Sequence, residues 1–167
     1  MADTTNGGAA PGADGRRQLA INAQYVKDLS FENPRAPQSL LQPPQGAAPD
    51  LQVGVDVKAA ALAADIYEVV MTLKVETKVQ NEVIFVAELS YGAVVSLINT
   101  TQEDVPIALM VEVPRLMFPY VRNIISEVTR DGGYTPLLLS PIDFVDIYRR
   151  RIAEQQQQAQ AGGPVTA

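Results

Sequence analysis

Histidine, cysteine and tryptophan are all missing from this chain of 167 residues. Histidine is the commonest general base at neutral pH, and cysteine supplies both a thiolate nucleophile and a soft metal ligand. The sequence also has no glycine-rich phosphate loop, neither a P-loop nor a dinucleotide fingerprint. We therefore expect a protein that is not an enzyme and that uses no cofactor and no metal.

Long apolar runs and clustered basic residues are scarce as well. No stretch approaches the roughly 20 apolar residues needed to cross a bilayer, and residues 1–15 lack the basic start and apolar run of a signal peptide. The net charge of -6 argues against a nucleic-acid partner, because phosphate binding needs clustered lysine and arginine. Since secreted domains of this size usually carry disulfides, the lack of cysteine fits a reducing compartment. We expect a cytoplasmic protein with no direct membrane insertion.

Apolar residues, in contrast, are plentiful. The chain is 47% hydrophobic and only 19% charged, which is below the usual quarter. A monomer of this length has difficulty hiding that much apolar surface. Self-association or a permanent apolar binding site is therefore expected.

Composition divides the chain into three parts. Residues 1–17 are of low complexity and carry no hydrophobic period, which predicts a disordered N-terminal tail. Residues 18–154 have the patterns of a single folded domain. Residues 155–167 are glutamines followed by alanine and glycine, and they are interpreted as a flexible C-terminal tail.

Alternating side chains predict four strands. From Gln18 to Glu32 the odd positions are mostly apolar and the even positions mostly polar, as in a strand with one buried face. The odd, core-facing positions are Leu19, Ile21, Ala23, Tyr25, Leu29 and Phe31. Further strands are predicted over 51–57, 66–77 and 82–98, with an alanine-rich connection over 58–64 and a possible bulge at Gly92. Short turns between successive strands favour an antiparallel sheet.

The spacing of apolar residues becomes helical after Thr101. A short helix is predicted over 103–112, ended by Pro114. A longer helix follows from about Leu116 to Gly132, with an apolar stripe at Val121, Ile124, Ile125 and Val128. The last helix is predicted to start with Ser140 as its N-cap and to end within residues 155–158. The fold class is therefore α+β, with helices following a four-stranded antiparallel sheet.

The polar face of this sheet is the first candidate binding surface. The even phase places Asp28 and Glu32 outward on the first strand. On the fourth strand it places Glu82, Ile84, Val86 and Glu88 outward. Acids on exposed strands commonly serve only to oppose aggregation, but they also attract cationic partners. The residues alone leave both interpretations open.

A second candidate surface involves the segment 33–50, which contains five prolines. A long loop within a compact domain is often functional. The apolar residues Leu40 and Leu41 of this segment, together with Ile147, Tyr148 and Ile152 of the last helix, either complete the core or form the walls of a groove for an extended polypeptide. The pattern is compatible with both.

Two carboxylate pairs are the remaining candidates for catalysis, Asp65 with Glu68 and Asp143 with Asp146. The second pair is better explained by the start of a helix, where negative charge is favourable. An enzyme would have to work with these carboxylates alone. A binding protein is therefore the favoured interpretation.

Several motifs resemble the SecB family of protein-export chaperones. They occur in order as Tyr25–Pro34 with Ala36-Pro37, Tyr67–Val70, Pro114–Arg122, and Pro136-Leu137 with Pro141–Phe144. The proline-flanked stretch Pro114–Arg122 is the most specific of them. Because the matches span residues 18–153, the chain is identified as a member of this family.

The resemblance implies an ATP-independent holdase that binds unfolded preproteins and delivers them to the motor ATPase SecA for export through the translocon. It also implies a four-stranded antiparallel sheet with helices packed on one face, assembling as a homotetramer that is a dimer of dimers. The main rival is a module of similar topology that recognises one folded partner or an apolar small ligand.

The resemblance also implies functional residues. The family's SecA contacts correspond to Asp28, Glu32, Val86 and Glu88, which are positions that the strand phase places outward. The family's client groove, between the crossover loop and the last helix, corresponds to Leu40, Leu41, Phe144, Tyr148 and Ile152.

Overall fold

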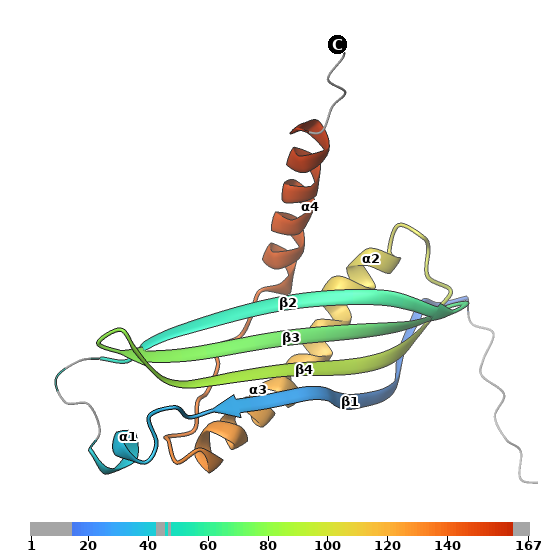
Figure 1. The fold of residues 1–167 in the computed structure, drawn as a ribbon. Helices are drawn as coiled ribbons and strands as arrows, with labels where there is room; N and C mark the ends of the chain where they lie inside the picture. Colours follow the sequence, from blue (N-terminus) through green and yellow to red (C-terminus); the bar gives the residue numbers. More distant parts are fainter. Residues whose placement is uncertain (1–14, 43–45, 47, 162–167) are drawn as a thin grey trace, which may run out of the picture.

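The computed structural model describes residues 15–42, 46 and 48–161, and its fold is an antiparallel sheet with helices on one face (Figure 1). In chain order the elements are β1 (Gln18–Glu32), α1 (Gln38–Leu41), β2 (Asp50–Ala63), β3 (Ile66–Val79), β4 (Glu82–Ile98), α2 (Val105–Ile107), the π-helical turn η1 (Ala108–Glu112), α3 (Val113–Asp131) and α4 (Phe144–Ala161). The strand order is β1-β4-β3-β2, and all three pairings are antiparallel. The predicted α+β class and four-stranded sheet are confirmed.

The core lies between the sheet and α3. Met117, Val121 and Ile125 of α3 are fully buried, as are alternate residues of β3 and β4. The buried strand residues on this face are Val69, Met71, Leu73, Val75, Ala87, Leu89, Ala93, Val95 and Leu97. The predicted stripe of α3 is thus the buried face, with Ile124 and Val128 partly buried at its margin. The opposite face of the sheet carries no helix (Figure 1).

The second strand is longer than predicted. Residues 58–63, expected to be an alanine-rich connection, continue β2 and pair with β3 as far as Ala63, which lies opposite Ile66. Alanine has a weak preference for strands, but pairing with the neighbouring strand overrides it. β2 therefore forms one full-length edge of the sheet.

Two β-bulges in β1 change the predicted phase of that strand. The register shifts between Ile21 and Ala23 and again between Val26 and Asp28, so one extra residue is inserted at each place. Between the bulges the two faces are exchanged, and Tyr25 lies opposite Gly92 on the face without helices. The expected core-facing positions of Ala23 and Tyr25 are therefore wrong. The second bulge restores the phase for the rest of the strand.

The helices begin and end differently from the prediction. Pro114 does not end the first helix, because α2, η1 and α3 follow one another without a break. The π-helical turn η1 lies just before Pro114, at the place where the N–H that proline lacks would interrupt a regular α-helical hydrogen-bond ladder. Asp143, rather than Ser140, caps α4, since its Oδ1 accepts from the backbone N–H groups of Val145 and Asp146 at 3.0 and 3.1 Å.

The last helix is also longer than expected. α4 runs to Ala161, so residues 155–161 are helical rather than the start of a flexible tail. The rest of that predicted tail, 162–167, lies outside the described residues, as does most of the predicted N-terminal tail, 1–14. None of the described helices combines the length and apolar character needed to cross a membrane.

The close approach of β1 to the end of α3 generates a stability prediction. A Cβ on Gly132 would clash with the ring of Phe31, which stacks on Phe85. We expect Gly132→Ala to lower the free energy of unfolding by about 1–3 kcal/mol, because the aromatic pair would have to move. Chemical denaturation measures the change. Gly54→Ala is the matched control, since nothing lies within 4 Å of a Cβ there, and equal destabilisation by both variants would contradict the steric explanation.

Candidate functional site

The face of the sheet without helices, called the outer face here, brings together the four predicted docking residues. Glu32 of β1 lies directly opposite Val86 of β4, and Ser30 lies opposite Glu88. Asp28 follows on the same face, opposite Ser90. Since Asp28 and Glu32 come after the second bulge, their predicted outward phase is correct.

Ile84 is not part of this surface. It was expected to extend the aliphatic patch beside Val86, but its side chain is buried. The register of β3 with β4 shifts at this point, with Thr77 opposite Phe85 and Lys78 opposite Val83, so Ile84 is the extra residue. It lines a cavity next to α1 instead.

The charges of the outer face are only partly acidic. Lys74 Nζ lies 2.7 Å from Glu88 Oε1, and Lys78 Nζ lies 2.6 Å from Glu76 Oε1. The hydrogen bond to Glu88 raises the pKa of Lys74. Within the part of the chain that the structure describes, Asp28 and Glu32 form no ion pair. These two exposed acids are therefore the charges that a cationic partner could engage without displacing a lysine.

The structure shows a polar cluster between the bulges that was not predicted from the sequence. The Tyr25 hydroxyl donates to Glu68 Oε1, and Lys27 Nζ lies 2.8 Å from the same oxygen. The Tyr25 ring reaches across β4 because Gly92 has no side chain; a Cβ there would lie 2.5 Å from the ring. Gly92, expected as a possible bulge, is regularly paired, and the bulges are on the neighbouring strand. A glycine within a strand can mark such a close approach.

The cluster shifts the pKa values of its members. Hydrogen bonds from Lys27 and then Tyr25 lower the pKa of Glu68, and the bond to Glu68 raises the pKa of Tyr25. Glu68 is consequently an ionised, already engaged carboxylate at neutral pH. It is unsuited to be the general acid or base that an enzyme would require.

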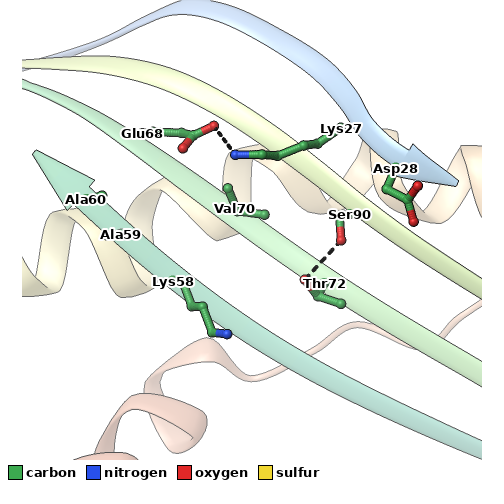
Figure 2. A pocket seen from close by; sticks show the side chains of 9 residues that line it. All are labelled: Lys27, Asp28, Lys58, Ala59, Ala60, Glu68, Val70, Thr72 and Ser90. Atoms are coloured by element: carbon green, nitrogen blue, oxygen red, sulfur yellow. Dashed lines mark hydrogen bonds and ion pairs between the residues drawn. The ribbon is translucent and has the colours of Figure 1, made fainter. Parts of the chain in front are cut away.

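Beside this cluster the outer face is hollowed by a depression of about 620 Å³ (Figure 2). Its floor includes Val70, Thr72 and Ser90, and the hydroxyls of Thr72 and Ser90 lie 3.2 Å apart. Figure 2 shows Lys27 reaching toward Glu68, whereas Asp28 makes no interaction with the other residues drawn. The depression is open and its charges are mixed, which suits a protruding side chain of a protein partner.

The second candidate catalytic pair, Asp143 with Asp146, has structural roles. Asp143 caps α4, and Arg150 Nε donates to Asp146 Oδ2 at 2.8 Å, one turn away. This hydrogen bond lowers the pKa of Asp146. Across residues 15–42, 46 and 48–161, no group of three or more Asp or Glu residues is placed to hold a metal ion.

The predicted client-groove residues are only partly brought together. Leu41 is 77% exposed and Leu40 is also exposed, both on α1 at one end of the sheet, whereas α4 projects past β2 (Figure 1). Tyr148 and Ile152 are partly buried on α4. Phe144 is 1% exposed and packs edge-on against Phe118, so its assignment to an open groove is wrong and it belongs to the core.

A row of adjoining cavities nevertheless links α1 to α4 along the helix side of β2. The first, called the α1 cavity here, has a volume of about 590 Å³ and is lined by Ser39, Pro49, Leu51, Thr77, Val79, Ile84, Phe85, Tyr134, Thr135 and Leu137. It shares Leu51 with a second cavity that includes Val53, Val55, Leu138 and Ile142, and further hollows continue to Ile147 and Arg151 of α4. We call this row the β2 groove.

The β2 groove is apolar in its middle and open to solvent. Leu51 and Val53 of the strand are exposed, as is Leu138 on the opposite wall. α4 is tied to the strand at the far end, where Arg151 Nη1 donates to the Val57 carbonyl at 2.5 Å. The sequence missed this groove because its second wall, residues 134–142, is an irregular segment without a repeating pattern.

Comparisons with known proteins bear on the family and the fold of this chain. The family model described as preprotein translocase subunit SecB matches residues 12–156. The chain is 48% identical to the protein-export protein SecB of Paramagnetospirillum magneticum over 86% of this chain and 92% of that protein. It is 47% identical to the Bradyrhizobium protein of the same name over 90% and 93%.

Among solved structures, a SecB-like chaperone of Mycobacterium tuberculosis, in complex with a peptide from an antitoxin, resembles the fold. The TM-score is 0.57 at 19% identity, covering 74% of this chain and 90% of that one. At this identity the likeness concerns the fold.

The Glu68 cluster generates a pH prediction. The folded pKa of Glu68 is lowered from 4.5, so its ionised form stabilises the fold above about pH 4.5, and this contribution is lost as the pH falls through the folded pKa. We expect Glu68→Gln to lose less unfolding free energy than the unmodified chain between pH 7 and pH 3. The difference should stay below about 1 kcal/mol, because solvent screens the pair.

Urea denaturation at a series of pH values measures this difference. Glu103→Gln is the matched control, since it removes one exposed carboxylate from the turn before α2. If both substitutions reduce the loss of unfolding free energy at acid pH equally, the Lys27–Glu68–Tyr25 cluster does not cause that loss.

Proposed function

The chain belongs to the SecB family, and on that premise we propose that it is an export chaperone that holds unfolded preproteins and passes them to the motor ATPase SecA, without using a nucleotide itself. The observation that carries the proposal is the β2 groove, an open apolar surface that adjoins the free edge of a sheet. A site of this kind suits an extended chain of varied sequence.

Client binding would combine apolar and backbone contacts. Leu51, Val53 and Leu138 present exposed side chains to the groove, and each apolar client side chain buried there would contribute about 1.5–3 kcal/mol before entropic losses. β2 is an edge strand, so its outer edge has backbone groups that can pair with an extended peptide. Leu40, Leu41, Tyr148 and Ile152 would extend the groove at its two ends.

SecA would dock on the outer face through Asp28, Glu32, Val86 and Glu88. Asp28 and Glu32 supply exposed charge, and Val86 supplies an aliphatic contact directly opposite Glu32. Acidic surfaces steer and orient cationic partners. Because the β2 groove lies on the helix side, SecA could engage the outer face while a client is still bound.

We further propose that four chains assemble in the cytoplasm as a dimer of dimers. Leu116 and Tyr120 of α3, and Val26 and Leu29 of β1, are exposed apolar residues on the helix side of the sheet. Arg122 Nε is buried on α3 without a hydrogen-bond partner among the described residues. Contact with a second copy would cover this apolar surface and offer a partner to Arg122. Several client segments could then bind one assembly at high effective concentration.

The holdase role predicts suppression of aggregation without ATP. We expect the purified chain to keep a slowly folding preprotein soluble when less than one tetramer is present for each preprotein molecule. Light scattering measures the aggregation. Val53→Asp should weaken client binding about tenfold, because a charge would enter the apolar middle of the groove.

Leu62→Asp is the matched control for this experiment. Leu62 lies on the same strand and is also exposed, but it does not line the groove. No suppression by the unmodified chain would contradict the holdase role and favour a module for one folded partner. Equal loss in both variants would contradict the assignment of the groove.

The docking role predicts a separate effect of charge. The double substitution Asp28→Arg with Glu32→Arg should weaken SecA binding about tenfold and leave client binding unchanged, since the two surfaces are on opposite faces. Surface-immobilised SecA and a labelled client peptide measure the two affinities. Glu103→Arg with Asp131→Arg changes the net charge equally at other exposed sites. Equal weakening by both pairs would mean that overall charge, rather than this face, attracts SecA.

A further inference from the structure

Helix α1 has little apolar anchorage of its own. It is one turn long, Gln38–Leu41, and only Ser39 among its residues is buried. Leu41 points into solvent, and Leu40 is partly exposed, with its methyl groups next to Gly133, where a Cβ would lie 3.1 Å from them. Another interaction is needed to hold this helix at the rim of the α1 cavity.

A hydrogen-bond relay supplies that interaction. The Tyr134 hydroxyl donates to Asn33 Oδ1 at 2.6 Å, and it lies 2.9 Å from Ser39 Oγ. Since the single hydroxyl hydrogen of Tyr134 goes to Asn33, Ser39 must be the donor in the second bond. Asn33 Nδ2 in turn donates to the Gly132 carbonyl at 3.1 Å. The relay thus joins the end of β1, helix α1 and the segment after α3.

The Tyr134 ring is held independently of its hydroxyl. It packs against Phe85 with ring centroids 5.0 Å apart, and Phe85 stacks on Phe31 at 5.6 Å. The ring also lines the α1 cavity, as does Ser39. Removing the hydroxyl alone should therefore leave the aromatic packing in place and release α1.

We propose that Asn33, Ser39 and Tyr134 form a clasp that holds α1 closed on the α1 cavity, and that Tyr134 is a positioning residue for client binding. The second half of this inference rests on the proposed client function of the β2 groove. When only a fraction of molecules has the binding-competent conformation, the apparent affinity falls by that fraction. The clasp would keep that fraction high by fixing the wall at this end of the groove.

Tyr134→Phe tests the clasp directly. Loss of its hydrogen bonds should speed amide exchange at Leu41 and Gln42 about fivefold or more, since a net hydrogen bond typically changes an opening equilibrium by that factor. The N–H groups of these residues are bonded only within the segment, to the carbonyls of Pro37 and Gln38. Ser39→Ala removes the same link from the other side and should give the same acceleration, and the double variant should add little.

Tyr67→Phe is the matched control, because it removes a tyrosine hydroxyl from β3, and Tyr67 lines none of the cavities of the β2 groove. Exchange at Leu41 and Gln42 should stay unchanged in it. Unchanged exchange in both Tyr134→Phe and Ser39→Ala would overturn the clasp. Amide exchange is measured without a client, so it tests the clasp even if the holdase proposal fails.

The positioning role is tested with a fluorescent unfolded-preprotein peptide. We expect Tyr134→Phe to bind it several-fold more weakly, and Tyr67→Phe to bind it as the unmodified chain does. Faster exchange with unchanged peptide affinity would overturn the positioning role. Peptide binding that is absent in the unmodified chain would overturn the holdase proposal, and with it this half of the inference.

Discussion

The pairing of β1 with β4 determines which side chains the molecule presents on its outer face. Each of the two bulges in β1 adds one residue, so the strand exchanges its faces at Asn22 and recovers them at Lys27. Tyr25 is thereby turned outward onto Gly92, and Lys27 is brought to Glu68. The same second bulge keeps Asp28 and Glu32 beside Val86 and Glu88. The proposed docking surface depends on this register.

The sheet also separates the two proposed activities. Helix α3 covers the middle of one face, and the outer face carries no helix, which leaves it open to the proposed docking partner. On the helix side, β2 is a full-length edge strand whose apolar residues are only partly covered by residues 134–142. An edge strand beside open apolar surface is normally an aggregation hazard. In a protein that holds unfolded chains, we propose that the same feature is the binding site.

Much of the fold follows from patterns within single segments. Alternation from Gln18 to Glu32 and from Glu82 to Ile98 predicted β1 and β4 with their observed bounds. The apolar stripe of α3 was readable for the same reason. The part of β2 beyond Val57 could not be predicted, because its alanines have little strand preference of their own and are held in the strand by pairing with β3. The unbroken run from α2 to α3 was also missed, since local rules for proline do not include a π-helical turn.

The outer-face acids could be found from the sequence because strand phase and family motifs both identify them. Ile84 and Phe144 could not be placed in this way, since an apolar side chain gives no sign of whether it meets solvent or a neighbour. By itself the sequence determined the α+β class, the family and the outward placement of the acids Asp28, Glu32 and Glu88. Only the tertiary structure decided the β2 groove, the Tyr25 cluster and the clasp at Tyr134. These three depend on contacts between residues some 40 to 100 positions apart, which no local pattern encodes.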